Sequence, residues 1–115
     1  MVLDKNVKIT ISGKDYNLCF PIRELFAAEK ELSSQNLLTT LAKQATELPS
    51  IGDLYVLFYH AVKGGKNGLD DDGIEGLWED AIDELTLPIV AKSIYEAIGK
   101  SGIFGKKIQA AGLKA

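Results

Sequence analysis

The spacing of apolar residues changes at Pro21, and this change limits the folds open to the chain. Before Pro21, apolar and polar residues alternate in two short segments, and this period of two places each apolar set on one face of a β-strand. The two sets are Val7, Ile9 and Ile11, and Tyr16, Leu18 and Phe20. Gly13 lies between them and can adopt the positive φ of a tight turn. Residues 7–20 are therefore expected to form a β-hairpin. A lone hairpin is marginally stable, so its apolar face needs helices against it.

After Pro21 the apolar residues recur every third or fourth position, the period of helices that bury one face. Pro49, Gly64-Gly65 and Pro88 separate the periodic segments. The expected helices span residues 21–32, 37–47, 51–63, 73–85 and 87–98. Their apolar stripes begin with Ile22, Leu25, Phe26 and Leu32 in the first helix and Leu38, Leu41, Ala42 and Ala45 in the second.

These patterns predict an α+β fold that is mainly α: an N-terminal β-hairpin followed by about five helices in a single compact domain. The domain is expected to span residues 1–105, and residues 106–115 are expected to form a flexible basic tail. The chain has 115 residues, a length that fits one domain with a modest core.

Composition indicates which partners and which cell compartment to expect. The net charge is -3, whereas nucleic-acid binders usually carry a basic surface, so we expect no nucleic-acid partner. Cys19 is the only cysteine, so the fold uses no internal disulfide, which fits the cytosol. No stretch approaches the ~20 apolar residues of a membrane helix, and the first residues lack the apolar run of a signal peptide. We therefore expect a cytoplasmic protein that does not associate with membranes.

One acidic segment is similar to a calcium-binding loop. With Gly73 as the sixth position of an EF-hand loop, Asp70 and Asp72 fall at the third and fifth positions and Glu79 at the twelfth. The first position, however, is Gly68, which has no side-chain ligand. We therefore favour an acidic helix N-terminus, stabilised by the helix dipole, over a metal site.

Other chemical sites have less support. A Cys19–His60 pair would need hydrogen-bond contact and an orienting third group, which the sequence does not indicate. His60 is instead expected to be an ordinary half-buried residue. The glycine-rich segment 63–68 follows a helix and lacks the spacing of a phosphate-binding loop, so it is interpreted as a helix stop and a flexible connection. We expect no cofactor and no enzymatic activity.

Charge and aromatic residues favour protein binding. Residues 70–84 hold eight acidic residues and no Lys or Arg, whereas the chain after Glu96 holds only basic charges, at Lys100, Lys106, Lys107 and Lys114. Such runs are usually solvated faces, but an acidic face could also meet a basic surface on another copy or a partner. Tyr55 and Tyr59 share one helix face; if the face of Leu54, Phe58 and Ala61 is core, the tyrosines could form a contact surface. The candidate partner-binding residues are Tyr55, Tyr59, Val62, Trp78, Tyr95 and Phe104.

The order of these features resembles a known family. The hairpin of residues 7–18 leads directly into Pro21-Ile22-Arg23-Glu24-Leu25-Phe26-Ala27-Ala28-Glu29-Lys30, followed by a short leucine-rich helix, an aromatic helix and an acidic helix with Trp78. This layout resembles the tail assembly chaperones of long-tailed bacteriophages and prophages, over most of the chain up to about Gly99. It is a likeness of layout and not of a chemical signature.

The resemblance implies a role in building a phage tail. Such chaperones bind the tape measure protein, keep it soluble, recruit tail tube subunits and are absent from the finished virion. Many relatives also have a frameshifted, C-terminally extended product. We leave open a homo-oligomer, another small regulatory or interaction module of phage origin, and a calcium-binding protein.

Overall fold

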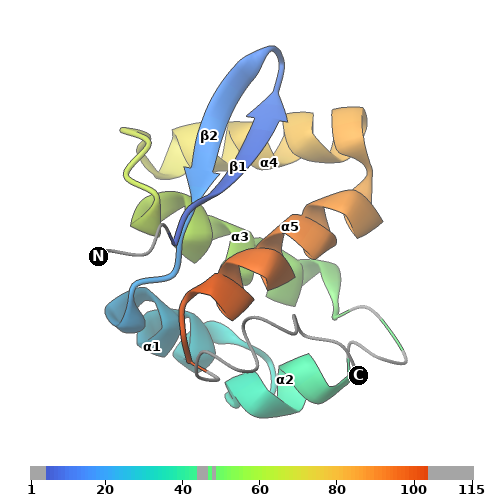
Figure 1. Cartoon of the computed structure of the whole chain (residues 1–115). Coiled ribbons are helices and arrows are strands. Elements are labelled where there is room, and N and C mark those ends of the chain that lie inside the picture. Colours follow the sequence, from blue (N-terminus) through green and yellow to red (C-terminus); the bar gives the residue numbers. More distant parts are fainter. Residues whose placement is uncertain (1–4, 44–46, 48, 104–115) are drawn as a thin grey trace.

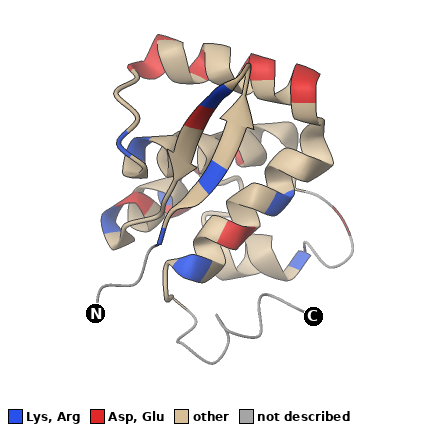
Figure 2. Ribbon diagram, turned by 45° about the horizontal axis from the view of Figure 1, so that its top comes forward, with Lys and Arg blue, Asp and Glu red and all other residues tan. Residues whose placement is uncertain are grey.

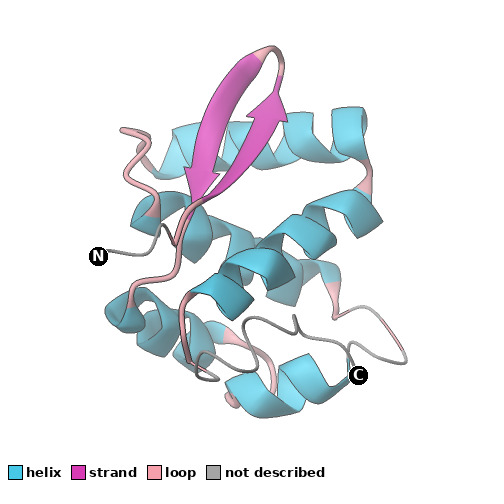
Figure 3. Ribbon diagram, in the orientation of Figure 1, coloured by secondary structure: helices cyan, strands magenta, loops and turns pink. Residues whose placement is uncertain are grey.

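The computed structural model describes residues 5–43, 47 and 49–103, and its elements follow the predicted order (Figure 1). Strands β1 (Val7–Ile11) and β2 (Lys14–Leu18) pair antiparallel, and five helices follow them. The helices are α1 (Ile22–Glu31), α2 (Leu37–Lys43), α3 (Ile51–Gly64), α4 (Asp71–Leu85) and α5 (Leu87–Lys100). The predicted α+β, mainly α fold class is confirmed (Figure 3).

The hairpin forms where the alternation predicted it, but β2 ends at Leu18, and Phe20, although buried, lies beyond the strand. Val7, Ile9 and Ile11 are buried, and the residues between them are exposed. Ser12 and Gly13 form the two-residue turn with φ of 53° and 76°, the left-handed pair that matches the twist of a hairpin. The Ser12 amide also donates to Glu84 Oε2 (2.6 Å), which ties the turn to the end of α4.

Helix α3 is the centre of the fold. It packs against α1, α4, α5 and β2, and its side chains Leu54, Leu57 and Phe58 are fully buried. Its start is capped by Ser50, because the Ser50 hydroxyl accepts from the Asp53 amide (3.1 Å). An apolar helix with neighbours on several sides fits this central position.

The helix stop predicted at Gly64-Gly65 is confirmed, and the segment after it contacts the hairpin through Asn67. The side-chain amide of Asn67 donates to the carbonyls of Asn17 (2.8 Å) and Val62 (2.9 Å), and its Oδ1 accepts from the Asn17 amide (2.9 Å). Asn67 therefore satisfies the outer edge of β2 as a neighbouring strand would.

Helix boundaries differ slightly from the predictions. Helix α4 begins earlier, with Asp70 as its cap, because the Asp70 side chain accepts from the Gly73 amide (2.8 Å). Helix α5 continues through the buried Gly99 to Lys100. In α2, Asn36 caps the start, because its side-chain Oδ1 accepts from the Thr39 amide (3.0 Å). The predicted end of that helix falls on residues 44–47, of which 44–46 lie outside the described part.

Two of the predicted apolar stripes are partly wrong. Ile22 and Phe26 of α1 are 58% and 60% exposed, although Leu25 and Leu32 are buried as expected. In α2 the inward residues are Leu37, Thr40 and Leu41, and Leu38 points outward. The surface therefore carries large apolar side chains that the sequence pattern had assigned to the core.

Candidate functional site

The two faces of α3 differ in burial. Leu54, Phe58 and Ala61 are fully buried, whereas Tyr55 and Tyr59 are only partly buried. The ring of Tyr55 contacts Trp78 edge-on, with centroids 5.5 Å apart, and lies 6.3 Å from the ring of Tyr59. Because the first face is core, the two tyrosines form a surface, supported from beneath by Trp78.

This surface is the floor of an open cleft of about 390 Å³. The cleft lies where the end of α1, the middle of α3 and the start of α4 meet. Its lining residues are Glu31, Tyr55, Val56, Tyr59, Asp71, Asp72 and Glu75. We call it the acidic cleft, because four of these residues are carboxylates and none is a Lys or Arg.

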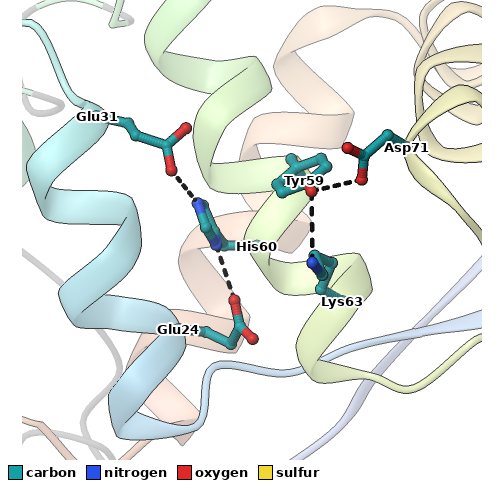
Figure 4. A network of polar contacts seen from close by, with 6 residues as sticks. All are labelled: Glu24, Glu31, Tyr59, His60, Lys63 and Asp71. Carbon is teal, nitrogen blue, oxygen red and sulfur yellow. Dashed lines mark hydrogen bonds and ion pairs between the residues drawn. The ribbon is translucent and has the colours of Figure 1, made fainter.

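Hydrogen bonds on one wall of the acidic cleft fix the ring of Tyr59. The Tyr59 hydroxyl donates to Asp71 Oδ1 (2.6 Å) and accepts from Lys63 Nζ (3.4 Å), as Figure 4 shows. The bond to Asp71 raises the pKa of Tyr59, and the bond to Tyr59 raises the pKa of Lys63. The pKa of Tyr55 is raised by burial and then by the charge of Glu75. Both phenols therefore stay neutral and the ammonium stays charged at physiological pH.

His60 connects α3 to α1 beside this cleft. Its Nδ1 lies 2.8 Å from Glu24 Oε1 and its Nε2 lies 2.8 Å from Glu31 Oε2, and the residue is 5% exposed (Figure 4). An ionised carboxylate offers only acceptor oxygens, so each of the two contacts needs its proton on the ring nitrogen or on the carboxyl group. His60 is thus a buried bridge between two carboxylates, and the expected half-buried bystander is wrong.

Sequence reasoning missed this bridge, although a signal was present. Glu24, Ala28 and Glu31 are spaced at i, i+4 and i+7, which places them on one face of α1. Two acids on the face that also carries a small residue indicate a polar contact with a neighbouring helix. The sequence contains a single histidine that could supply that contact.

The geometry gives no support to the alternative chemical sites. Both ring nitrogens of His60 face carboxylates, so neither is left to activate Cys19. Asp71, Asp72 and Gly73 lie in the first turn of α4, and a helical turn does not have the shape of a calcium loop. In the part of the chain that the structure describes, no group of three or more His, Cys, Asp or Glu residues is placed to hold a metal ion.

The candidate partner-binding residues separate into four groups. Tyr55 and Tyr59 lie on the surface of the acidic cleft. Val62 and Trp78 are 1% and 8% exposed, and assigning them to a contact surface is wrong because both pack in the core. Tyr95 is half-buried on α5, with its hydroxyl turned inward. Phe104 lies outside the described residues.

The inward hydroxyl of Tyr95 leads to a stability prediction. Among the described residues it has no hydrogen-bond partner, and burial raises its pKa from 10.0 to about 12. A buried hydroxyl without a partner costs about 1–3 kcal/mol, so Tyr95→Phe is expected to raise the free energy of unfolding by about 1 kcal/mol at neutral pH.

The same substitution is expected to change the alkaline limb of the stability curve. The folded pKa of Tyr95 lies above the unfolded value, so the neutral phenol is favoured in the folded state. Its contribution to the free energy of unfolding is complete below pH 10 and is lost as the pH rises toward 12. The wild type should lose stability over this pH range, and Tyr95→Phe should lose less. The loss that remains in Tyr95→Phe is expected to come from Tyr55 and Tyr59, whose pKa values are also raised. Urea unfolding at pH 7.5 and pH 11 measures both effects; a destabilised variant with an unchanged pH slope would contradict the assignment.

A second surface feature is the set of exposed large apolar side chains. They are Ile22, Phe26, Leu38, Ile51, Ile89 and Ile103. Ile22 and Phe26 are one turn apart on α1, so they form a continuous apolar strip on its outer face. We call this pair the α1 strip.

Comparisons with protein-family models, curated proteins and solved structures give no match. Within the described residues, none of the helices has the length and apolar character needed to span a bilayer.

Proposed function

We propose that this protein is a tail assembly chaperone of a long-tailed phage or prophage, which binds the tape measure protein in the host cytosol. The proposal starts from the resemblance in layout, since a hairpin that leads directly into a run of helices is the order expected for that family. The chain acts in this account by binding and not by catalysis, and tail tube subunits are a second partner.

The observation that carries the proposal is the α1 strip. Ile22 and Phe26 are more than half exposed although the sequence pattern places them with core residues. A chaperone for a long amphipathic client needs apolar surface that its own fold leaves uncovered. An isolated exposed side chain would need no explanation, but two adjacent ones form a surface against which a client helix can pack.

The surrounding charge is consistent with this role. Asp and Glu line the outer face of α4, as Figure 2 shows, and no Lys or Arg occurs between residues 70 and 84. A surface of one charge sign opposes association between copies and keeps an apolar strip compatible with solubility.

Co-expression with a phage tape measure protein tests the proposal. We expect the wild type to keep the client soluble, and Ile22→Ser/Phe26→Ser to lose most of that effect, because the two side chains would supply the apolar contact. Leu38→Ser/Ile89→Ser is the matched control, since it removes two equally exposed apolar side chains from other helices. A client that is insoluble with the wild type, or equally soluble with both variants, would contradict the proposal.

A further inference from the structure

The side-chain amide of Asn67 closes the junction between the end of α3 and the hairpin. Its two N–H groups donate to the backbone carbonyls of Asn17 in β2 (2.8 Å) and Val62 in α3 (2.9 Å), and its Oδ1 accepts from the Asn17 amide (2.9 Å). Val62 lies in the last turn of α3, where a helix leaves its carbonyls without intrahelical donors. One amide therefore serves both as a cap for α3 and as a neighbour for β2.

The residue after Asn67 is Gly68, and this pair is chemically reactive. The backbone nitrogen that follows an asparagine can attack the carbon of the side-chain amide, and glycine has no side chain to hinder the attack. Gly68 is exposed, and the position of a Cβ on it is open space. The other asparagines of the sequence precede valine or leucine, so Asn67 is the one that glycine follows; the others are Asn6, Asn17 and Asn36.

We propose that Asn67–Gly68 is a site of spontaneous deamidation that the folded chain keeps closed and the opened chain exposes. The Gly68 nitrogen forms a bond to Cγ of Asn67 and loses its proton, and the side-chain nitrogen leaves with that proton as ammonia. The product is a cyclic succinimide. Water then opens the ring at either carbonyl and leaves aspartate or isoaspartate at position 67. The reaction consumes water, releases ammonia and transfers no electrons, so it requires no further reactant.

The folded junction opposes this reaction. The nitrogen that leaves as ammonia is the atom that donates to Asn17 and Val62, so the reaction cannot proceed without losing both hydrogen bonds. Asn67 is also half-buried, and its oxygen is held by the Asn17 amide, so its Cγ is not free to rotate toward Gly68. The rate of modification in native buffer should therefore follow the fraction of molecules in which this junction is open.

The products do not fit the junction from which they came. A carboxylate at position 67 has only acceptor oxygens, and these would face the carbonyls of Asn17 and Val62 to which the amide donated. Isoaspartate also adds a carbon atom to the main chain before Gly68. Opening of the junction thus becomes a one-way event, because a modified chain cannot restore the cap of α3 or the neighbour of β2. Deamidation involves no residue of the α1 strip, so it is independent of the proposed function.

Peptide mapping of the full chain by mass spectrometry tests the reactive site and its protection. The protein is incubated at mildly alkaline pH in native buffer and in guanidinium chloride. We expect modification at Asn67 in guanidinium chloride and at least about tenfold slower modification in native buffer. Asn17 and Asn36 should stay unmodified in both. Equal rates at Asn67 would show that the folded junction gives no protection, and no modification in guanidinium chloride would show that the pair is unreactive; either result overturns the inference.

A variant that carries one of the products tests the one-way step. Asn67→Asp is expected to lower the denaturant midpoint of unfolding, because its carboxylate meets two carbonyls. Asn36→Asp is the matched control. It adds the same charge, but the side-chain oxygen of Asn36 accepts from the Thr39 amide, a role that a carboxylate fills equally well, so its midpoint should stay close to that of the wild type. An Asn67→Asp protein with the wild-type midpoint would contradict the one-way step.

Refolding of the incubated wild type gives an independent measurement of the same step. After dilution from guanidinium chloride, gel filtration separates the folded monomer from chains that fail to refold. Chains modified at position 67 should be enriched in the second fraction. An equal share of modified chains in the two fractions would overturn the claim that the products are excluded from the junction.

Discussion

Substitution of Gly65 by alanine is expected to lower the free energy of unfolding by about 3 kcal/mol or more. A Cβ at this position would lie 1.9 Å from the carbonyl oxygen of Asn17 and 2.6 Å from its carbonyl carbon. Both are backbone atoms of β2, which cannot move without disrupting the pairing with β1. Gly64 has the same constraint, with a Cβ 2.1 Å from the carbonyl oxygen of Cys19. The glycine pair is required because α3 ends directly against the hairpin.

The matched control for this prediction is Gly76→Ala. Gly76 lies inside α4, and a Cβ there meets nothing within 4 Å. Alanine should therefore stabilise the helix by roughly 0.5–1 kcal/mol, because glycine loses more conformational entropy on folding. Urea unfolding of the two variants should give changes of opposite sign. A Gly65→Ala protein as stable as the wild type would mean that α3 does not approach β2 as closely as described.

Replacing His60 by leucine is expected to cost about 2–3 kcal/mol. The substitution keeps most of the volume but leaves Glu24 and Glu31 facing an apolar side chain and each other. Glu24 is the more affected, because its side chain is 17% exposed whereas that of Glu31 is 55% exposed and can turn to water. The loss should come mainly from one desolvated carboxylate.

A second substitution tests whether the carboxylate causes that loss. Adding Glu24→Gln to His60→Leu removes the unpaired charge and should recover about 1 kcal/mol, whereas adding Glu31→Gln should recover less. Chemical unfolding of the wild type, the three single variants and the two double variants gives the coupling energies. Equal destabilisation in His60→Leu and in both double variants would show that His60 acts through packing alone.

The His60 bridge also explains why the sequence pattern was wrong at α1. Apolar periodicity predicted a helix over residues 21–32, and α1 forms over Ile22–Glu31, but the same periodicity wrongly assigned Ile22 and Phe26 to the buried stripe. Glu24 and Glu31 contact His60, so the face of α1 that carries these two acids lies against α3. Leu25 and Ala28 are buried beside this contact, and Ile22 and Phe26 are left in solvent.

Local signals were otherwise sufficient for most of the fold. The alternation in β1, the Ser50 and Asn36 caps and the period of α4 each specify an element without reference to the rest of the chain. The acidic cleft and the Asn67 contacts could not be predicted in this way. They depend on residues up to 50 positions apart in sequence that meet only when the helices pack.

The most direct test of the central claim is the affinity of the purified protein for a helical segment of the tape measure protein, measured by calorimetry. The account predicts binding by the wild type and by Leu38→Ser/Ile89→Ser. It predicts at least about tenfold weaker binding by Ile22→Ser/Phe26→Ser, since each buried apolar side chain is worth about 1.5–3 kcal/mol. Equal affinities for all three proteins, or no binding by the wild type, would contradict the claim that the α1 strip is a client-binding surface.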